Sequence, residues 1–236
     1  MKRKCRFTER IPRTPQVTSF RFEPLEGRFE YKPGQFATVM FDPEHPRNRE
    51  LNKYLSFSCA AVHPYVEVTK KMSGSAFSRS LSELRPGDSV WFEGPRGRCV
   101  FEDSMSKTSF LIGGIGITPV ISVIEHVIHH RLSCELKLFY SNRTERDIAF
   151  KAELDRWSDR ADQLRVFHTL TDCASSPGYC REGRIGQGWI REYAPDIEDH
   201  TVFLFGPPAM VSAMEGLCRE LGCPPDKIKK ENFTGY

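Results

Sequence analysis

The stretch Leu111–Val120, LIGGIGITPV, constrains the fold most, because three glycines separate an apolar run from the start of an apolar helical pattern. Glycine weakens strands and helices alike, so this junction predicts a close approach of the backbone to another group. We expect Thr118 to cap the following helix and Pro119 to occupy its first position. Amides at a helix start attract anions such as phosphate, but Gly114-x-Gly116 lacks the third glycine of the dinucleotide fingerprint. A tight turn without a ligand therefore stays open as the alternative.

Two rhythms divide the chain. Up to about residue 103, turn formers such as KPGQ and RPGD separate short runs rich in Val, Phe, Tyr and Thr, which predicts a small antiparallel barrel. These runs are VTSFRFEP, GQFATVMF, KYLSFSCA, YVEVTKK and DSVWFEGP. After about residue 107, strand-like and helix-like segments alternate (TSFLI, PVISVIEHVIHH, ELKLFY, DIAFKAELDRWSD, LRVFHTL, TVFLF), which predicts a doubly wound parallel sheet. We expect a β domain at 1–103 and an α/β domain at 107–236, joined by EDSMSK.

Charge and cysteine content argue against several classes of protein. The chain has 34 basic and 31 acidic residues, and its net charge of +3 is too small to indicate a nucleic-acid partner. No apolar run approaches the ~20 residues of a membrane span, and no apolar segment follows the basic start, so we expect a cytoplasmic protein. The eight cysteines, without any C-x-x-C pair, predict thiols and no iron–sulfur cluster. The histidines at 126, 129 and 130 are interpreted as a surface cluster, and no metal site is expected.

Glycine-containing turns follow two of the predicted parallel strands, in LIGGIGITP and in FLFGPPAM. Open parallel sheets bind ligands beyond the carboxyl ends of their strands. These two turns are therefore the expected ligand-binding loops of the α/β domain.

A barrel followed by GGIGITP and FGPPAM resembles the ferredoxin–NADP reductase superfamily of flavoproteins. The resemblance runs from YKPGQF (Tyr31–Phe36) to ENF (Glu231–Phe233). It implies a six-stranded antiparallel barrel that holds FAD and a second domain that binds NADH or NADPH. It also implies that electrons pass from NAD(P)H through FAD to a separate acceptor protein, such as ferredoxin, flavodoxin, a cytochrome or an oxygenase component.

The first flavin motif of the family, Arg-x-Tyr-Ser-x-x-Ser, is replaced here by KYLSFSC at residues 53–59. The resemblance implies that Lys53 neutralises the FAD pyrophosphate, with the charge of arginine but without its bidentate fork. Leu55 takes the place of the aromatic ring on the isoalloxazine, and Ser56 that of the serine near flavin N5. The implied flavin contacts in this segment are Lys53, Tyr54, Leu55, Ser56 and Phe57.

The second flavin motif is better kept. GSAFSRSL, at residues 74–81, resembles Gly-x-x-Ser-x-x-Leu with one extra residue, and VEVTKK precedes it. The resemblance implies that amides and the Ser78 hydroxyl face the pyrophosphate at a helix start. The implied contacts are Val68, Thr69, Lys70, Gly74, Ser75 and Ser78. Lys71 and Arg79 are either further contacts or a solvated basic face.

The family pattern also implies nucleotide-binding residues in the second domain. In the two glycine-containing loops they are Gly114, Gly116, Thr118, Pro119, Gly206, Pro207 and Met210. Phe205 stands where the family often has a cysteine near the site of hydride transfer. Ser141, Asn142 and Arg143 are the candidates for the adenosine half, and Arg146 for a 2′-phosphate. The lack of an acidic residue at this strand end favours NADPH, but similar loops occur in NADH-using relatives, so the coenzyme stays open.

The last segment, IKKENFTGY, resembles the Glu-x-aromatic end of the family, which implies a carboxylate from Glu231 near the flavin. Such a carboxylate can relay a proton. Phe233 is the first candidate for covering the open flavin face and Tyr236 the second, and a frayed tail is the alternative. Ser56 and Glu231 are thus the two predicted catalytic residues.

Two other functions stay open beside electron transfer to a partner protein. A free-flavin reductase fits the chain length and the lack of an iron–sulfur domain. A non-catalytic nucleotide-binding subunit fits the altered residues Lys53, Leu55 and Phe205.

Overall fold

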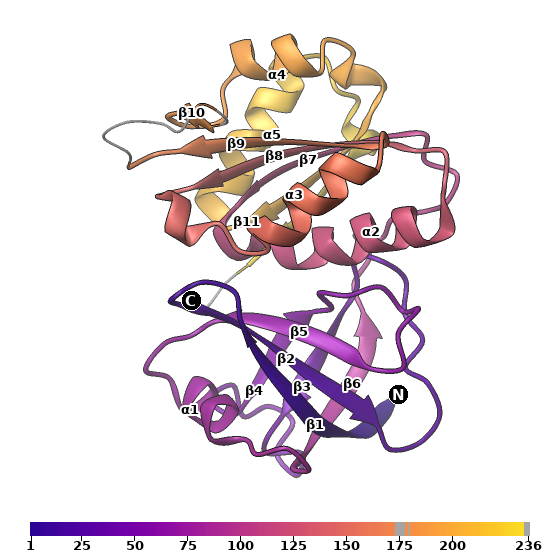
Figure 1. Cartoon of the computed structure of the whole chain (residues 1–236), viewed down its shortest axis with the longest axis vertical. Helices are drawn as coiled ribbons and strands as arrows, with labels where there is room; N and C mark the ends of the chain where they lie inside the picture. The colour runs from indigo at the N-terminus through magenta and orange to yellow at the C-terminus, as the bar shows by residue number, and fades with distance from the viewer. Residues whose placement is uncertain (173–177, 179, 234–236) are drawn as a thin grey trace. The chain divides into compact units, whose positions relative to one another are not determined.

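The computed structural model describes residues 1–172, 178 and 180–233, and the chain forms two compact units. Unit 1 comprises Met1–Phe101 together with Thr118–His126. Unit 2 comprises Glu102–Ile117 and Val127–Tyr236. Each unit is built around its own six-stranded sheet (Figure 1).

The sheet of unit 1 is antiparallel, with strand order β4-β3-β6-β1-β2-β5. It curls until its two edge strands meet, because Phe57, just beyond β4, forms an antiparallel bridge with Val68 of β5. This confirms the predicted six-stranded antiparallel barrel. The strands are β1 (Lys2–Pro12), β2 (Val17–Pro24), β3 (Phe36–Met40), β4 (Asn52–Ser56), β5 (Val66–Lys71) and β6 (Ser89–Arg96).

Aromatic side chains fill the core of unit 1. Phe22 packs edge-on against Phe92 with ring centroids 5.0 Å apart, and Tyr31 stacks on Phe57 at 3.8 Å. Helix α1 (Ala76–Glu83) inserts Phe77, which is fully buried, into the same cluster. Burial of a phenylalanine side chain contributes roughly 1.5–3 kcal/mol, so this cluster holds the barrel together.

Unit 2 contains a fully parallel sheet, with strand order β10-β9-β8-β7-β11-β12. Helices cover both of its faces, α2 and α3 on one and α4 and α5 on the other (Figure 1), which confirms the doubly wound sheet. The strands are β7 (Lys107–Gly113), β8 (Glu135–Asn142), β9 (Leu164–Leu170), β10 (Cys180–Glu182), β11 (Thr201–Gly206) and β12 (Ile228–Asn232). The helices are α2 (Ile117–His130), α3 (Lys151–Arg160), α4 (Gln187–Tyr193) and α5 (Pro208–Glu220), with 3₁₀ turns η1 (Gly114–Gly116), η2 (Glu145–Asp147), η3 (Ile197–Asp199) and η4 (Pro225–Lys227).

The order of these strands reverses between β7 and β11. The chain moves outward from β7 through β8 and β9 to β10, then returns to place β11 on the other side of β7. Open α/β sheets bind ligands beyond the carboxyl ends of the strands at such a reversal. Both glycine-containing loops follow these two strands.

Seven cysteines lie in the described part of the chain and form no disulfide. Among the described residues, no helix has the length and apolar character needed to cross a membrane.

Candidate functional site

Two lysines lie close together at the barrel closure. Lys53 is on β4 and Lys70 on β5, and Lys70 is buried, with 7% of its surface exposed. Its ammonium donates a hydrogen bond to the Lys71 carbonyl at 3.1 Å. Burial and the nearby charge of Lys53 lower the pKa of Lys70, and no carboxylate pairs with either lysine in the described part of the chain. Two cations held together without a counter-ion form a site suited to a polyanion such as a pyrophosphate.

A ring of serine hydroxyls stands at the start of α1. Ser75 is the N-cap, and its hydroxyl accepts a hydrogen bond from the Ser78 amide at 3.3 Å. The hydroxyls of Ser73, Ser75 and Ser78 lie 3.1–3.2 Å from one another. Ser78 is buried, and its hydroxyl belongs to this ring. Gly74 is exposed, and a Cβ there would meet open space. The helix start therefore combines orphan amides and hydroxyls, which suits an anionic ligand.

The side chains of β4 alternate between two faces. Leu55 is half-buried against the barrel core, and Tyr54 points the other way, 68% exposed, with its ring against that of Phe36. Ser56 is 8% exposed, and its hydroxyl has no hydrogen-bond partner among the described residues. An almost buried hydroxyl without a partner is available to a ligand.

Three of the implied flavin contacts are enclosed. Phe57 and Val68 are fully buried in the barrel core, so a ligand would reach only their main chains. The Thr69 hydroxyl lies 2.6 Å from both the Ser19 and Ser58 hydroxyls, so it is engaged inside the protein.

The loop after β7 needs glycine for two different reasons. Gly114 has a φ of +52°, which favours glycine, and a Cβ there would meet open space. A Cβ on Gly116 would stand 2.2 Å from the Phe205 carbonyl oxygen, so this glycine lets the two loops pack backbone against backbone. The Tyr140 hydroxyl donates a hydrogen bond to the Gly114 carbonyl at 3.0 Å, which links this loop to β8.

Helix α2 starts differently from the expectation. It begins at Ile117 with Gly116 as its N-cap and no side-chain cap, whereas Thr118 was expected to cap it and Pro119 to occupy its first position. The 3₁₀ turn at Gly114–Gly116 feeds directly into the helix, so Thr118 and Pro119 lie within its first turn, and Thr118 is buried. The cap assignment was therefore wrong.

The loop after β11 complements the first. Gly206 has a φ of +156°, and Pro207 is the N-cap of α5. Met210, in the first turn of this helix, lies against the first loop, because a Cβ on Gly113 would stand 2.5 Å from the Met210 sulfur. The two glycine-containing loops thus pack together at the strand reversal. At Gly114 the first loop borders open space, because no atom lies within 4 Å of where a Cβ would stand.

The adenosine candidates follow β8. Asn142 is buried at the strand end beside the Tyr140 hydroxyl, yet its carboxamide makes no hydrogen bond of normal geometry with any described residue. Ser141 is half-buried, and Arg143 is exposed and pairs with Asp172 at 3.0 Å. An unpaired buried carboxamide at a strand end suits a polar ligand group.

Near its end the chain adds β12 to the edge of the sheet, with Glu231 in register with Phe205 of β11. Burial alone raises the pKa of Glu231 to about 7. Phe205 is buried, and its ring packs on that of Phe233 with centroids 6.3 Å apart, while the Phe233 amide donates to the Gly206 carbonyl. The first part of the predicted tail is therefore ordered against β11. Tyr236 lies outside the described residues.

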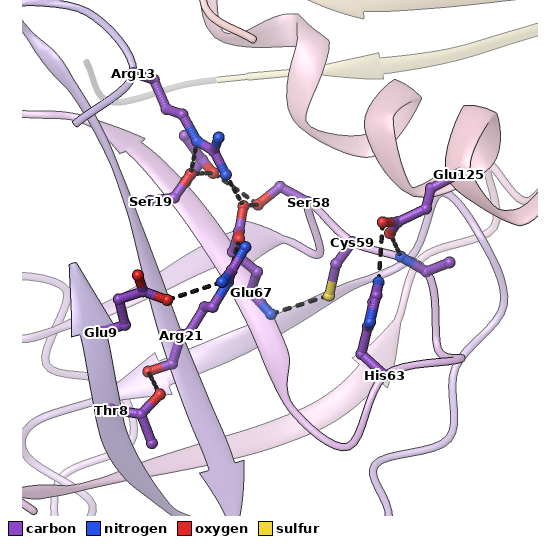
Figure 2. Close-up of polar contacts among 12 residues, drawn as sticks. Thr8, Glu9, Arg13, Ser19, Arg21, Ser58, Cys59, His63, Glu67 and Glu125 are labelled. Atoms are coloured by element: carbon purple, nitrogen blue, oxygen red, sulfur yellow. Dashed lines mark hydrogen bonds and ion pairs between the residues drawn. The ribbon is translucent and has the colours of Figure 1, made fainter. Parts of the chain in front are cut away.

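Sequence reasoning missed two carboxylates, one that accepts a hydrogen bond from Ser58 of the first flavin motif and one that binds the segment just after the motif. Glu67 of β5 lies between Arg13 and Arg21, and Glu125 of α2 accepts hydrogen bonds from the Ala60 amide at 2.6 Å and from His63 at 2.9 Å (Figure 2). Each contact joins residues far apart in the chain, so no local pattern signals it.

Comparison with known proteins gives one family match and several relatives. Residues 110–216 match the family described as the oxidoreductase NAD-binding domain. NADH-cytochrome b5 reductase 1 of Mortierella alpina is 28% identical over 227 residues, which cover 93% of this chain and 75% of that protein. The reductase component of propane 2-monooxygenase from Mycolicibacterium goodii is 26% identical over 230 residues, which cover 94% of this chain and 65% of that protein.

Solved structures share the whole fold. The flavohem-like FAD/NAD-binding domain of nitric oxide dioxygenase from Vibrio cholerae superposes with a TM-score of 0.85 at 21% identity, covering 98% of both chains. Residues 110–216 thus match an oxidoreductase NAD-binding domain, and the chain as a whole has the fold of these solved FAD/NAD-binding and ferredoxin–NADP reductase structures.

Proposed function

We propose that this chain is an NAD(P)H-dependent flavoprotein reductase that binds FAD and passes electrons to a separate acceptor protein. The observation that carries the proposal is the pair Lys53 and Lys70, in the same unit as the serine-lined start of α1. A buried lysine next to a second lysine is unfavourable in the empty protein, and a bound polyanion offsets that cost. FAD has a pyrophosphate, whereas FMN has a single phosphate, so the paired cations favour FAD.

The residues of the first flavin motif and Glu231 of unit 2 each have a defined role in the proposal. Bound FAD supplies the chemistry that accepts a hydride and releases electrons. Leu55 gives the ring an apolar surface, and the unpaired Ser56 hydroxyl orients it by a hydrogen bond near N5. Glu231, with a pKa of about 7, holds a proton at its carboxyl group near neutral pH.

Unit 2 supplies the features needed for the dinucleotide. The open turn at Gly114 allows a planar ring to approach the main chain, and the buried Asn142 carboxamide offers a donor and an acceptor. Alignment of two reactants is the main protein contribution to such a transfer. NADH and NADPH both remain candidates, because Arg143 and Arg146 suit a phosphate while a relative of this chain is named an NADH-cytochrome b5 reductase.

The acceptor is proposed from the relatives. Their names describe reduction of cytochrome b5 and service as the reductase component of an oxygenase. A redox protein of one of these kinds is therefore the proposed partner, and a cytoplasmic location remains part of the proposal.

Identification of the flavin tests the proposal. We expect the purified protein to retain FAD through gel filtration, with FAD and no FMN found by mass analysis of the released cofactor. Retention of FMN alone would contradict the pyrophosphate site. Loss of all flavin during filtration, with NAD(P)H oxidation restored by added free flavin, would support the free-flavin reductase instead.

A further inference from the structure

Glu67 is a buried carboxylate held by two arginines. Glu67 is 2% exposed, and the side chain of Arg13 is 8% exposed. One carboxylate oxygen accepts from Arg13 at 2.9 Å, and the other accepts from Arg21 at 2.9 Å (Figure 2). Arg21 also pairs with the more exposed Glu9 at 2.8 Å. The ionic cluster therefore ties β1, β2 and β5 together on the outer face of the barrel.

A chain of hydroxyls continues from this cluster to the first flavin motif. Ser58 donates to Glu67 at 3.3 Å, and the Ser58 and Thr69 hydroxyls lie 2.6 Å apart. Thr69 in turn lies 2.6 Å from Ser19, whose hydroxyl accepts from Arg13 at 2.8 Å. These contacts close a ring of buried polar groups around Glu67.

The ring restrains the main chain next to Ser56 and next to Lys70. Ser58 lies two residues after Ser56, just beyond the end of β4, so a contact at Ser58 restrains the main chain next to Ser56. Thr69 directly precedes Lys70. A second contact anchors the same segment, because the Glu67 amide donates to the Cys59 sulfur at 3.1 Å.

Stability alone does not require such an arrangement. Desolvation of buried ion pairs largely cancels their attraction, and apolar replacements are often as stable. Polar rings of this kind specify one geometry when every member is satisfied.

We propose that Glu67 is a positioning residue for the flavin: through Ser58 and Thr69 it fixes the strand segments that present Ser56 and Lys70. This inference rests on the proposed FAD site. Glutamine at position 67 would present an amide donor to one of the two guanidinium groups, so that arginine would lose its hydrogen bond to residue 67 and the Ser58–Thr69 pair would shift.

The test compares Glu67→Gln, Glu67→Asp and the double variant Arg13→Gln/Glu67→Gln, with Glu9→Gln as the matched control. Glu9→Gln removes a carboxylate from the same arginine, Arg21, but at the exposed side of the cluster. For each protein we would measure the Kd of FAD, the visible circular dichroism of bound flavin, the rate of flavin reduction by NAD(P)H and the apoprotein unfolding curve.

We expect Glu67→Gln to raise the Kd of FAD about tenfold or more, in line with the loss of one charge-assisted hydrogen bond. The flavin dichroism should change and reduction should slow, while the KM for NAD(P)H stays within about twofold. Glu67→Asp should recover part of the affinity, and Glu9→Gln should behave as wild type.

The double variant separates positioning from folding, because it removes one positive and one negative charge together. We expect its unfolding curve to return toward wild type while FAD binding and dichroism stay impaired. Wild-type FAD affinity and dichroism in Glu67→Gln would overturn the inference, as would recovery of both in the double variant. If the wild-type chain bound no FAD, the proposed function would fail first.

Discussion

Glu231 offers the sharpest test of the second unit, because its carboxyl group is desolvated on the edge strand β12. Its side chain is half-buried, and burial is the sole cause of its raised pKa. We predict that Glu231→Gln stabilises the protein at alkaline pH, since glutamine carries no charge that must be desolvated.

The magnitude follows from linkage between protonation and folding. The pKa rises from 4.5 to about 7 on folding, which corresponds to about 3 kcal/mol at 1.36 kcal/mol per pH unit. Between these two pH values the folded state keeps a proton that the unfolded state has lost, so wild-type stability falls as pH rises through this window. Below about pH 4.5 both states are protonated and the penalty disappears, whereas above about pH 7 it is complete.

Urea unfolding at pH 4 and pH 8, at constant flavin concentration, measures the difference. Glu231→Gln should gain about 2–3 kcal/mol over wild type at pH 8 and almost nothing at pH 4. The control is Glu220→Gln at the exposed end of α5, which should change stability by less than about 0.5 kcal/mol at both values. An equal gain at both pH values, or no gain at pH 8, would show that the Glu231 carboxylate is not desolvated.

Three further predictions concern the two loops and the flavin motif. Lys70→Met should raise the Kd of FAD by about tenfold or more while stabilising the apoprotein, because it removes a buried like charge beside Lys53. A loss of apoprotein stability together with the loss of FAD affinity would contradict this prediction. Gly116→Ala should cost more than about 3 kcal/mol by thermal unfolding, because its Cβ would stand 2.2 Å from the Phe205 carbonyl oxygen, whereas Gly188→Ala on α4 meets open space and should be neutral or stabilising. Equal effects of the two glycine changes would refute the close loop contact. Ser56→Ala should slow flavin reduction in stopped flow with little change in coenzyme KM, and a wild-type rate would remove Ser56 from the site.

Strands with a characteristic side-chain pattern were predictable from the sequence. Strands that depend mainly on main-chain pairing were missed. Five barrel strands follow from runs of β-branched and aromatic residues. The sixth, β1, was not among the predicted runs, because it is mostly charged and buries little more than Cys5 and Phe7. Strand β12, with the polar sequence IKKEN, is held at the sheet edge by main-chain pairing with β11, which leaves no mark on side-chain composition.

Helix α3 shows how a local motif can be misread. The segment DIAFKAELDRWSD predicted a helix from Asp147, but α3 begins at Lys151. Thr144 and Asp147 form a capping box on the short turn η2, which ends at Asp147. Phe150, the N-cap of α3, has a φ of +61°, so the helical conformation does not run on from η2 into α3.

The candidate site also contains residues that the sequence could identify and residues that it could not. Glycine loops and the two flavin motifs are contiguous in sequence, so a resemblance can identify them. Glu67 lies between two valines and gives no sign of its role, because its partner Arg21 faces it only through the register of β2 with β5. Side-chain burial also depends on tertiary structure, which is why the motif could not show that Phe57 and Val68 belong to the core.

The most direct test of the central claim is anaerobic titration of the FAD-loaded protein with NADH and, separately, with NADPH. We predict that one equivalent of at least one coenzyme bleaches the visible absorption of the bound flavin, and that reoxidation by an added redox protein restores it. Flavin absorption that stays unchanged with both coenzymes, in a protein shown to hold FAD, would contradict the account and leave a nucleotide-binding subunit without reductase activity.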